Sequence, residues 1–115
     1  MAEIDAPKLW LSVKWDIETK IIQGIYKGGE RLPSVMELSR IYGVGRSTIQ
    51  KVISEMCEDT TLTTRGAKGT YINPFIKSKL LYNHKIVLRE RYKGLIKDAS
   101  EIGLTEFDIT QSENW

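Results

Sequence analysis

A chain of 115 residues, 41% apolar and 28% charged, is long enough for one compact domain with an appended element, but not for a large separate catalytic or ligand domain. One cysteine excludes an internal disulfide, and with a single histidine it offers no zinc ligand set, so we expect no metal site and no cofactor. The net charge of +2 joins a basic body, with 17 basic and 10 acidic side chains in residues 1–97, to a tail with five acids and no base in residues 98–115. A basic body suits a polyanionic partner, although solvated lysines on exposed helix faces give many proteins the same excess.

The first predicted element is a helix over roughly Lys8 to Gln23. Val13, Ile17 and Ile21 recur at helical spacing and form one apolar stripe, which Trp10 and Ile25 extend. The helix is expected to end at Gly24, and Gly28-Gly29 then makes a turn toward the next element.

The second predicted helix begins at Ser34, because Ser34 and Glu37 form a capping box behind Pro33. Gly43 can adopt the positive φ that ends a helix sharply, and Val44 after it can insert into the core. The buried stripe of this helix is expected to consist of Val35, Leu38, Ile41 and Tyr42.

A third helix follows from about Gly45 after this tight turn. Its apolar positions are Ile49, Val52, Ile53 and Met56. The polar side chains on its other faces, near its amino-terminal half, are Arg46, Ser47, Thr48, Gln50 and Lys51. Two short helices with this turn have the layout of a helix-turn-helix that reads DNA in the major groove. Ser47 and Thr48 could instead satisfy backbone donors of the first turn, whereas a cation such as Arg46 at a helix amino end is unfavourable unless an anion lies nearby.

A β-hairpin is predicted after the third helix. Residues 62–65 and 69–72 are rich in β-branched and aromatic side chains and flank the short connection Gly66-Ala67-Lys68. Asn73-Pro74 ends the second strand. Three helices followed by such a hairpin form a winged helix, with Arg65 and Lys68 at the tip of the wing.

The rest of the chain is predicted to be helical. A long helix runs from about Phe75 to Ile102, and its apolar seam needs a surface to bury it, for which a second copy is the simplest candidate. Gly103 ends this helix, and Thr105 with Asp108 opens a short final helix through about Gln111. The residues expected to fold back on the long helix are Leu104, Phe107 and Ile109. The predicted fold is mainly α with a small β-hairpin: a winged helix-turn-helix domain in residues 1–74 and a C-terminal two-helix dimerisation element in residues 75–115.

These segments together resemble a known family, the GntR-type transcriptional regulators, and the shortness of the chain resembles its YtrA-type subfamily, in which two C-terminal helices replace an effector domain. The matching segments are Gly29-Glu30-Arg31-Leu32-Pro33-Ser34, Glu37-Leu38, Gly43-Val44, Arg46-Ser47-Thr48-Ile49-Gln50 and Lys68-Gly69-Thr70-Tyr71-Ile72. The resemblance implies that Ser34 meets a phosphate, that the third helix lies at or in the major groove, and that residues 66–68 reach the minor groove. The sequence departs from the family at Met36, where many members have an arginine that contacts DNA.

The candidate site residues fall into two sets. The DNA-binding set is Arg31, Ser34, Gly45, Arg46, Ser47, Thr48, Gln50, Lys51, Arg65, Gly66 and Lys68. The dimer-interface set is Leu81, Leu88, Tyr92, Leu95, Ala99 and Ile102.

The function predicted from these features is a sequence-specific DNA-binding transcription regulator, in this family most often a repressor, that binds an inverted-repeat operator as a homodimer. The alternative is a winged helix used as a protein–protein interaction module. An enzyme is not expected, because no nucleophile, base and orienting group converge. We expect a packed rather than catalytic role for His84 and no redox role for Cys57, beside Glu58 and Asp59. No apolar run approaches the ~20 residues of a membrane span and no signal peptide is visible, so we expect a cytoplasmic protein with no membrane partner; no small-molecule effector is assigned.

Overall fold

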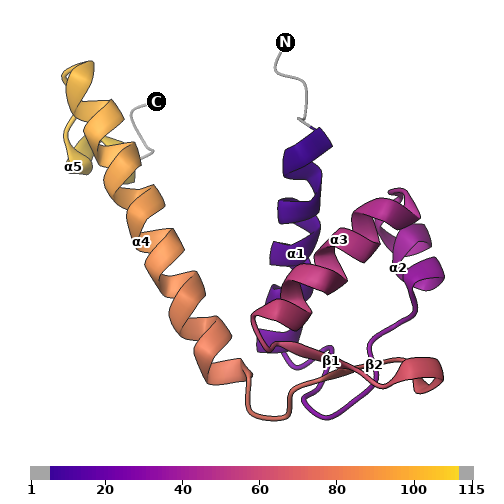
Figure 1. Ribbon diagram of the computed structural model, residues 1–115. Coiled ribbons are helices and arrows are strands. Elements are labelled where there is room, and N and C mark those ends of the chain that lie inside the picture. Colours follow the sequence, from indigo (N-terminus) through magenta and orange to yellow (C-terminus); the bar gives the residue numbers. More distant parts are fainter. Residues whose placement is uncertain (1–5, 112–115) are drawn as a thin grey trace. The chain divides into compact units, whose positions relative to one another are not determined.

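The structure, a computed structural model, describes residues 6–111 of the chain (Figure 1). Its elements in chain order are α1 (Ala6–Ile22), α2 (Val35–Tyr42), α3 (Arg46–Glu58), β1 (Leu62–Thr64), a 3₁₀ turn (Gly66–Lys68), β2 (Thr70–Ile72), α4 (Lys77–Glu101) and α5 (Glu106–Thr110). They form two compact units, one that ends at Leu80 and one that begins at Leu81. The predicted mainly helical fold with one antiparallel hairpin is confirmed. No described helix is long and apolar enough to cross a membrane.

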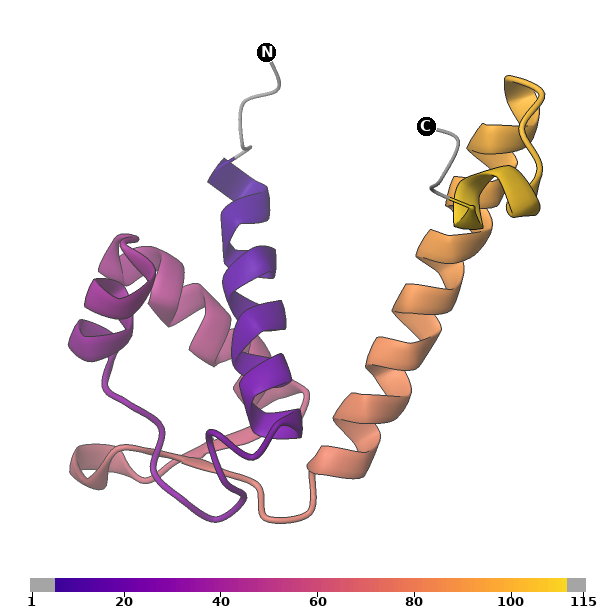
Figure 2. The same ribbon diagram turned by 180° about the vertical axis from the view of Figure 1, so that it is seen from behind.

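The first unit is a three-helix arrangement with a hairpin. Both views show α1, α2 and α3 on the same side of the hairpin, with α1 next to α3 (Figures 1 and 2). In the hairpin Leu62 pairs with Ile72 and Thr64 with Thr70. The buried core residues are Val13, Ile17, Ile21, Leu32, Leu38, Ile49, Val52, Ile53, Met56, Leu62, Ile72, Ile76 and Leu80. Since this core includes Ile76 and Leu80, the beginning of the C-terminal segment packs with the winged helix rather than apart from it.

Two residues predicted to be buried in this unit are exposed. Ile41 is 54% exposed, because Leu38 anchors α2 in the core with Val35 and Tyr42 to one side of it, and Ile41 lies on the other side. Ile25 is 59% exposed, because Gly24 ends the helical path before it and takes Ile25 out of the apolar stripe of α1.

The hairpin and the start of α4 differ slightly from the predicted bounds. Each strand is one residue shorter than expected, because residues 66–68 form a 3₁₀ turn. The long helix begins at Lys77 rather than at Phe75, since the Asn73 side-chain oxygen accepts the Phe75 N–H at 3.0 Å and turns the chain before the helix starts.

In the second unit α5 folds back along α4, as predicted. The Leu104 N–H donates to the Ala99 carbonyl at 2.9 Å, and the Tyr92 hydroxyl donates to the Glu106 carboxylate. Leu104 and Ile109 are half-buried, but Phe107 is 67% exposed, because it lies on the side of the short helix opposite Ile109. The predicted capping box is present: the Asp108 N–H donates to Thr105 Oγ1 at 3.2 Å and the Thr105 N–H to Asp108 Oδ2 at 2.8 Å.

Candidate nucleic-acid interface

The amino end of α2 is fixed by the predicted capping box. The Glu37 N–H donates to Ser34 Oγ at 3.1 Å, and the Ser34 N–H donates to Glu37 Oε1 at 3.0 Å. The backbone and side-chain hydrogen bonds with Ser34 lower the pKa of Glu37, with smaller contributions from the charges of Arg31 and Arg40. Glu37 therefore stays ionised and holds Ser34 at the entrance of the helix-turn-helix. The Ser34 side chain accepts only the Glu37 N–H, so the backbone N–H groups of the two residues between them receive no bond from the capping side chain.

The turn between α2 and α3 is short and closed by hydrogen bonds. Gly43 adopts the left-handed conformation, with φ 63° and ψ 35°, and its N–H donates to the Ser39 carbonyl. The Val44 N–H donates to the same carbonyl at 3.2 Å, while the Ser39 hydroxyl donates to the Val44 carbonyl. These bonds, together with the packing of Val44 against the core, set the direction in which α3 leaves the turn.

The amino end of α3 is the part of the helix that the fold leaves most open. Gly45 is its N-cap and supplies no side-chain hydrogen bond to the first turn. Arg46 and Ser47 are exposed and Thr48 is half-buried. Within the described residues, the hydroxyls of Ser47 and Thr48 form no hydrogen bond, so they do not serve the capping role that was the alternative explanation for them. Backbone amides and polar side chains at this end are thus available to an external partner.

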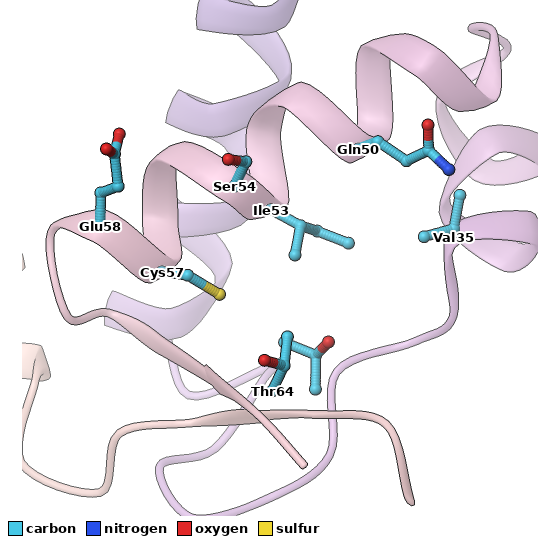
Figure 3. Close-up of a pocket in the computed structure, with 8 residues that line it drawn as sticks. Val35, Gln50, Ile53, Ser54, Cys57, Glu58 and Thr64 are labelled. Carbon is cyan, nitrogen blue, oxygen red and sulfur yellow. The ribbon is translucent and has the colours of Figure 1, made fainter. Parts of the chain in front are cut away.

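The two remaining polar candidates on α3, Gln50 and Lys51, point in different directions. Gln50 lies on the side of α3 that faces α2 and the hairpin (Figure 3). Lys51 is turned elsewhere: its Nζ lies 3.3 Å from Glu55 Oε2 and 5.0 Å from the centre of the Trp10 ring. The fold therefore gives Lys51 internal partners that Arg46 and Gln50 lack among the described residues.

A second set of candidate residues gathers on the hairpin. Arg65, Gly66 and Lys68 are all exposed at its turn. The Arg65 guanidinium carbon lies 4.2 Å from the centre of the Tyr71 ring. Arg31 belongs to this set rather than to the helices, because its backbone forms an antiparallel bridge with Tyr71 of β2. Sequence reasoning did not find this bridge, since it joins residues 40 positions apart and leaves no local pattern.

A groove of about 600 Å³ separates α3 from the hairpin (Figure 3). Its lining residues are Val35, Gln50, Ile53, Ser54, Cys57, Glu58, Thr64 and Thr70. Burial raises the pKa of the Cys57 thiol, and the Asp59 charge raises it further, so this thiol is held in its unreactive protonated form.

A polar cluster outside the interface ties α2 to α1. The Tyr42 hydroxyl donates to Asp16 Oδ2 at 2.6 Å, and Lys20 Nζ lies 2.9 Å from the same oxygen. The hydrogen bond from Tyr42, then that from Lys20, lowers the pKa of Asp16, while burial and then the bond to Asp16 raise the pKa of Tyr42 to about 12. Because Tyr42 is the last residue of α2, this cluster fixes the helix that immediately precedes the turn into α3.

Comparison with known proteins identifies this arrangement. The chain is 34% identical over 83 residues to the HTH-type transcriptional repressor YtrA of Bacillus subtilis, an alignment that covers 72% of this chain and 64% of YtrA. It is 30% identical over 104 residues to the uncharacterized HTH-type transcriptional regulator YhcF of the same organism, covering 90% of this chain and 84% of YhcF.

Solved structures show the same fold. A GntR family transcriptional regulator from Listeria monocytogenes superposes with a TM-score of 0.74 at 24% identity and covers 93% of each chain. The DNA-binding domain of AraR, solved in complex with operator ORX1, superposes with a TM-score of 0.54 at 30% identity, over 56% of this chain and 77% of that one. Residues 10–72, which hold every candidate DNA-binding residue, match the family described as bacterial regulatory proteins, gntR family. The chain therefore belongs to the GntR family of bacterial transcription regulators.

Proposed function

We propose that this chain is a sequence-specific DNA-binding transcription repressor that acts as a homodimer on an inverted-repeat operator. The observation that carries the proposal is the open amino end of α3, where Arg46, Ser47 and Gln50 are exposed beside an N-cap that supplies no side chain. Arginine and glutamine side chains form paired hydrogen bonds with base edges in the major groove. The operator complex of the AraR domain supports the same use of the fold in this chain.

The charge of Arg46 supports an anionic partner. A cation in the first turn of a helix is unfavourable by about 0.3–1 kcal/mol, because the helix dipole is positive at that end. No acidic side chain in the described part of the chain pairs with Arg46 to offset this cost. Phosphate groups and base acceptors of DNA supply the missing negative partner, so Arg46 is better placed for the complex than for the free protein.

The hairpin extends the same surface. Arg65 and Lys68 at its turn are exposed and, among the described residues, without an acidic partner. Lysine and arginine at such a site contact phosphates, which contributes affinity and fixes the register of the protein on the duplex. We assign sequence reading to the start of α3 and backbone binding to Ser34, Arg31 and the hairpin turn.

The homodimer is proposed from α4. Its row of apolar side chains, together with Ile102 just after its end, is exposed in a single chain: Leu81 46%, Leu88 51%, Tyr92 46%, Leu95 50% and Ile102 75%. Ala99, at 4% exposed, is already covered within its own chain, so we leave it out of the proposed interface. A second copy related by a two-fold axis buries the row against itself, and a two-fold dimer matches an inverted repeat.

We therefore assign DNA binding to residues 1–74 and dimerisation to the exposed row within residues 75–115, and we place the protein in the cytoplasm because its proposed partner is the chromosome. Anisotropy of a labelled random duplex tests the DNA-binding part against the alternative of a protein–protein module. We expect the logarithm of the binding constant to fall linearly with the logarithm of the salt concentration between ~50 and ~200 mM, with a slope of several units. Absence of binding at the low-salt end favours the protein–protein module instead.

A further inference from the structure

The hairpin is extended by a third segment that lies outside the named strands. The Gly29 N–H donates to the Ile72 carbonyl at 2.8 Å, the Ile72 N–H to the Glu30 carbonyl at 2.9 Å, and the Leu32 N–H to the Thr70 carbonyl at 2.8 Å. Residues 29–32 therefore run antiparallel to β2. The rules that place side chains on the two faces of a sheet then apply to all three segments.

These rules put two arginines and one tyrosine on the same face. Directly opposed residues of antiparallel strands project to the same side, and Tyr71 is opposed by Arg31 on one side and by Thr63 on the other. Arg65 follows Thr63 by two residues, so it shares that face. The other face carries Leu32, Leu62 and Ile72, which are buried in the core at 1%, 2% and 1% exposure. We call Arg31, Arg65 and Tyr71 the outer wing face.

The two arginines of the outer wing face are held in different ways. Arg65 stacks on Tyr71, with its guanidinium carbon 4.2 Å from the ring centre. Arg31 lies across Gly69: its Nε is 2.8 Å from the position that a Cβ on Gly69 would occupy. Gly69 also has φ 104° and ψ −164°, a conformation that side chains disfavour, so this position needs glycine both for its backbone and for the space above it.

Neither arginine is neutralised within the fold. In residues 6–111 no acidic side chain forms an ion pair with Arg31 or Arg65, although the charge of Arg31 does lower the pKa of Glu37. An arginine stacked on an aromatic ring keeps its outward N–H groups available while losing much of its rotational freedom. Phosphate, which accepts paired hydrogen bonds from one guanidinium, is the partner that such a group fits.

We propose that Tyr71 is a positioning residue for DNA binding, whose ring holds Arg65 in place for a backbone phosphate beside the wing. This inference rests on the proposed DNA-binding function and names a residue that acts through Arg65 rather than by touching DNA. Arg31, seated over Gly69 on the same face, binds phosphate without help from the ring.

The test is a double-mutant cycle read by anisotropy on one labelled duplex at fixed salt. Tyr71→Val removes the ring and introduces a β-branched residue suited to a strand, and we expect it to weaken binding about two- to fivefold, the range that a cation–π contact at an exposed site supports. Tyr71→Phe retains the ring, so we expect it to bind with the affinity of the wild type. In an Arg65→Ala background, Tyr71→Val has no further effect beyond about 1.5-fold, whereas in an Arg31→Ala background it costs the same as in the wild type.

Several results overturn the proposal. Equal losses from Tyr71→Val with and without Arg65, or a loss from Tyr71→Phe as large as that from Tyr71→Val, assign the effect to the strand or the hydroxyl. Circular dichroism and thermal unfolding check that Tyr71→Val folds. If it does not, Tyr71→Thr, which also places a β-branched residue in the strand, takes its place in the cycle: we expect the same loss with Arg65 present and none in the Arg65→Ala background, and equal losses in both contradict the positioning role.

The same experiment separates this inference from the function on which it rests. If the wild-type protein does not bind the duplex, the DNA-binding proposal fails. If the wild type binds and Arg65→Ala weakens binding while Tyr71→Val does not, only the positioning role of Tyr71 fails.

Discussion

Placing charges in the apolar row of α4 is the sharpest perturbation of the proposed dimer. We choose Leu88→Asp together with Leu95→Asp, because these leucines lie seven residues apart in one row and are 51% and 50% exposed in a single chain. Burying a whole leucine side chain contributes about 1.5–3 kcal/mol, so the half still exposed is worth about 1 kcal/mol. A two-fold dimer buries four such halves, or about 4 kcal/mol, before the cost of burying aspartate is added. At 1.4 kcal/mol per factor of ten, the dissociation constant rises by about a thousandfold or more.

Light scattering after gel filtration at micromolar concentration measures this change directly. We expect a dimer for the wild type and a monomer for the double variant, with the helical circular dichroism of the winged helix retained. A matched control places aspartates on the opposite side of the same helix, at the exposed positions Asn83 and Lys97, and it stays dimeric. A wild-type monomer, or a Leu88→Asp and Leu95→Asp variant that remains dimeric, refutes the assignment of the interface to this row.

Three further predictions concern the winged helix. Arg46→Ala is expected to cost ~1–3 kcal/mol of specific binding and to leave random-duplex binding nearly intact, which competition anisotropy measures; a uniform loss on all sequences makes Arg46 a phosphate contact instead. Lys68→Ala is expected to weaken binding to every duplex and to lower the salt slope by about one unit, and an unchanged slope removes the hairpin turn from the interface. The pKa of Tyr42 is raised from 10.0 to about 12, so the folded state keeps the phenol proton longer than the unfolded state does, and this stabilisation is present below pH 10 and lost as the pH rises to 12. Between pH 10 and pH 12 the melting temperature is expected to fall more steeply for the wild type than for Tyr42→Phe. Parallel plots of melting temperature against pH contradict the role of the Tyr42 hydroxyl.

The features predicted from the sequence are those that a few neighbouring residues determine. The capping box of Ser34 and Glu37, and the left-handed Gly43, are local, because each depends on groups within one helical turn. The order of the elements and the exposed start of α3 followed from such signals together with apolar spacing. Packing decided the cases that were wrong: Ile41 has the spacing of a buried residue, but a helix of eight residues anchored through Leu38 leaves it exposed.

The three-dimensional surroundings of the candidate site residues could not be predicted from the sequence. Arg31 lies three residues before Ser34 in the sequence, yet backbone hydrogen bonds between residues 29–32 and β2 place it beside the hairpin. Lys51 belonged to the polar set of α3, yet contacts with Glu55 and Trp10 engage it within the fold. Both outcomes depend on which segments meet in space, and a segment such as Gly29-Glu30-Arg31 carries no strand pattern of its own.

Selection from a random duplex library with the purified wild-type protein, followed by sequencing, tests the central claim most directly. For the wild type we expect an enriched inverted repeat, whose two half-sites are related by the two-fold axis of the dimer. In the same selection with Arg46→Ala, we expect one base position of each half-site to lose its base preference. Enrichment of a single unpaired site contradicts the dimer on DNA, and a library that shows no enrichment under low-salt conditions contradicts sequence-specific DNA binding by this chain.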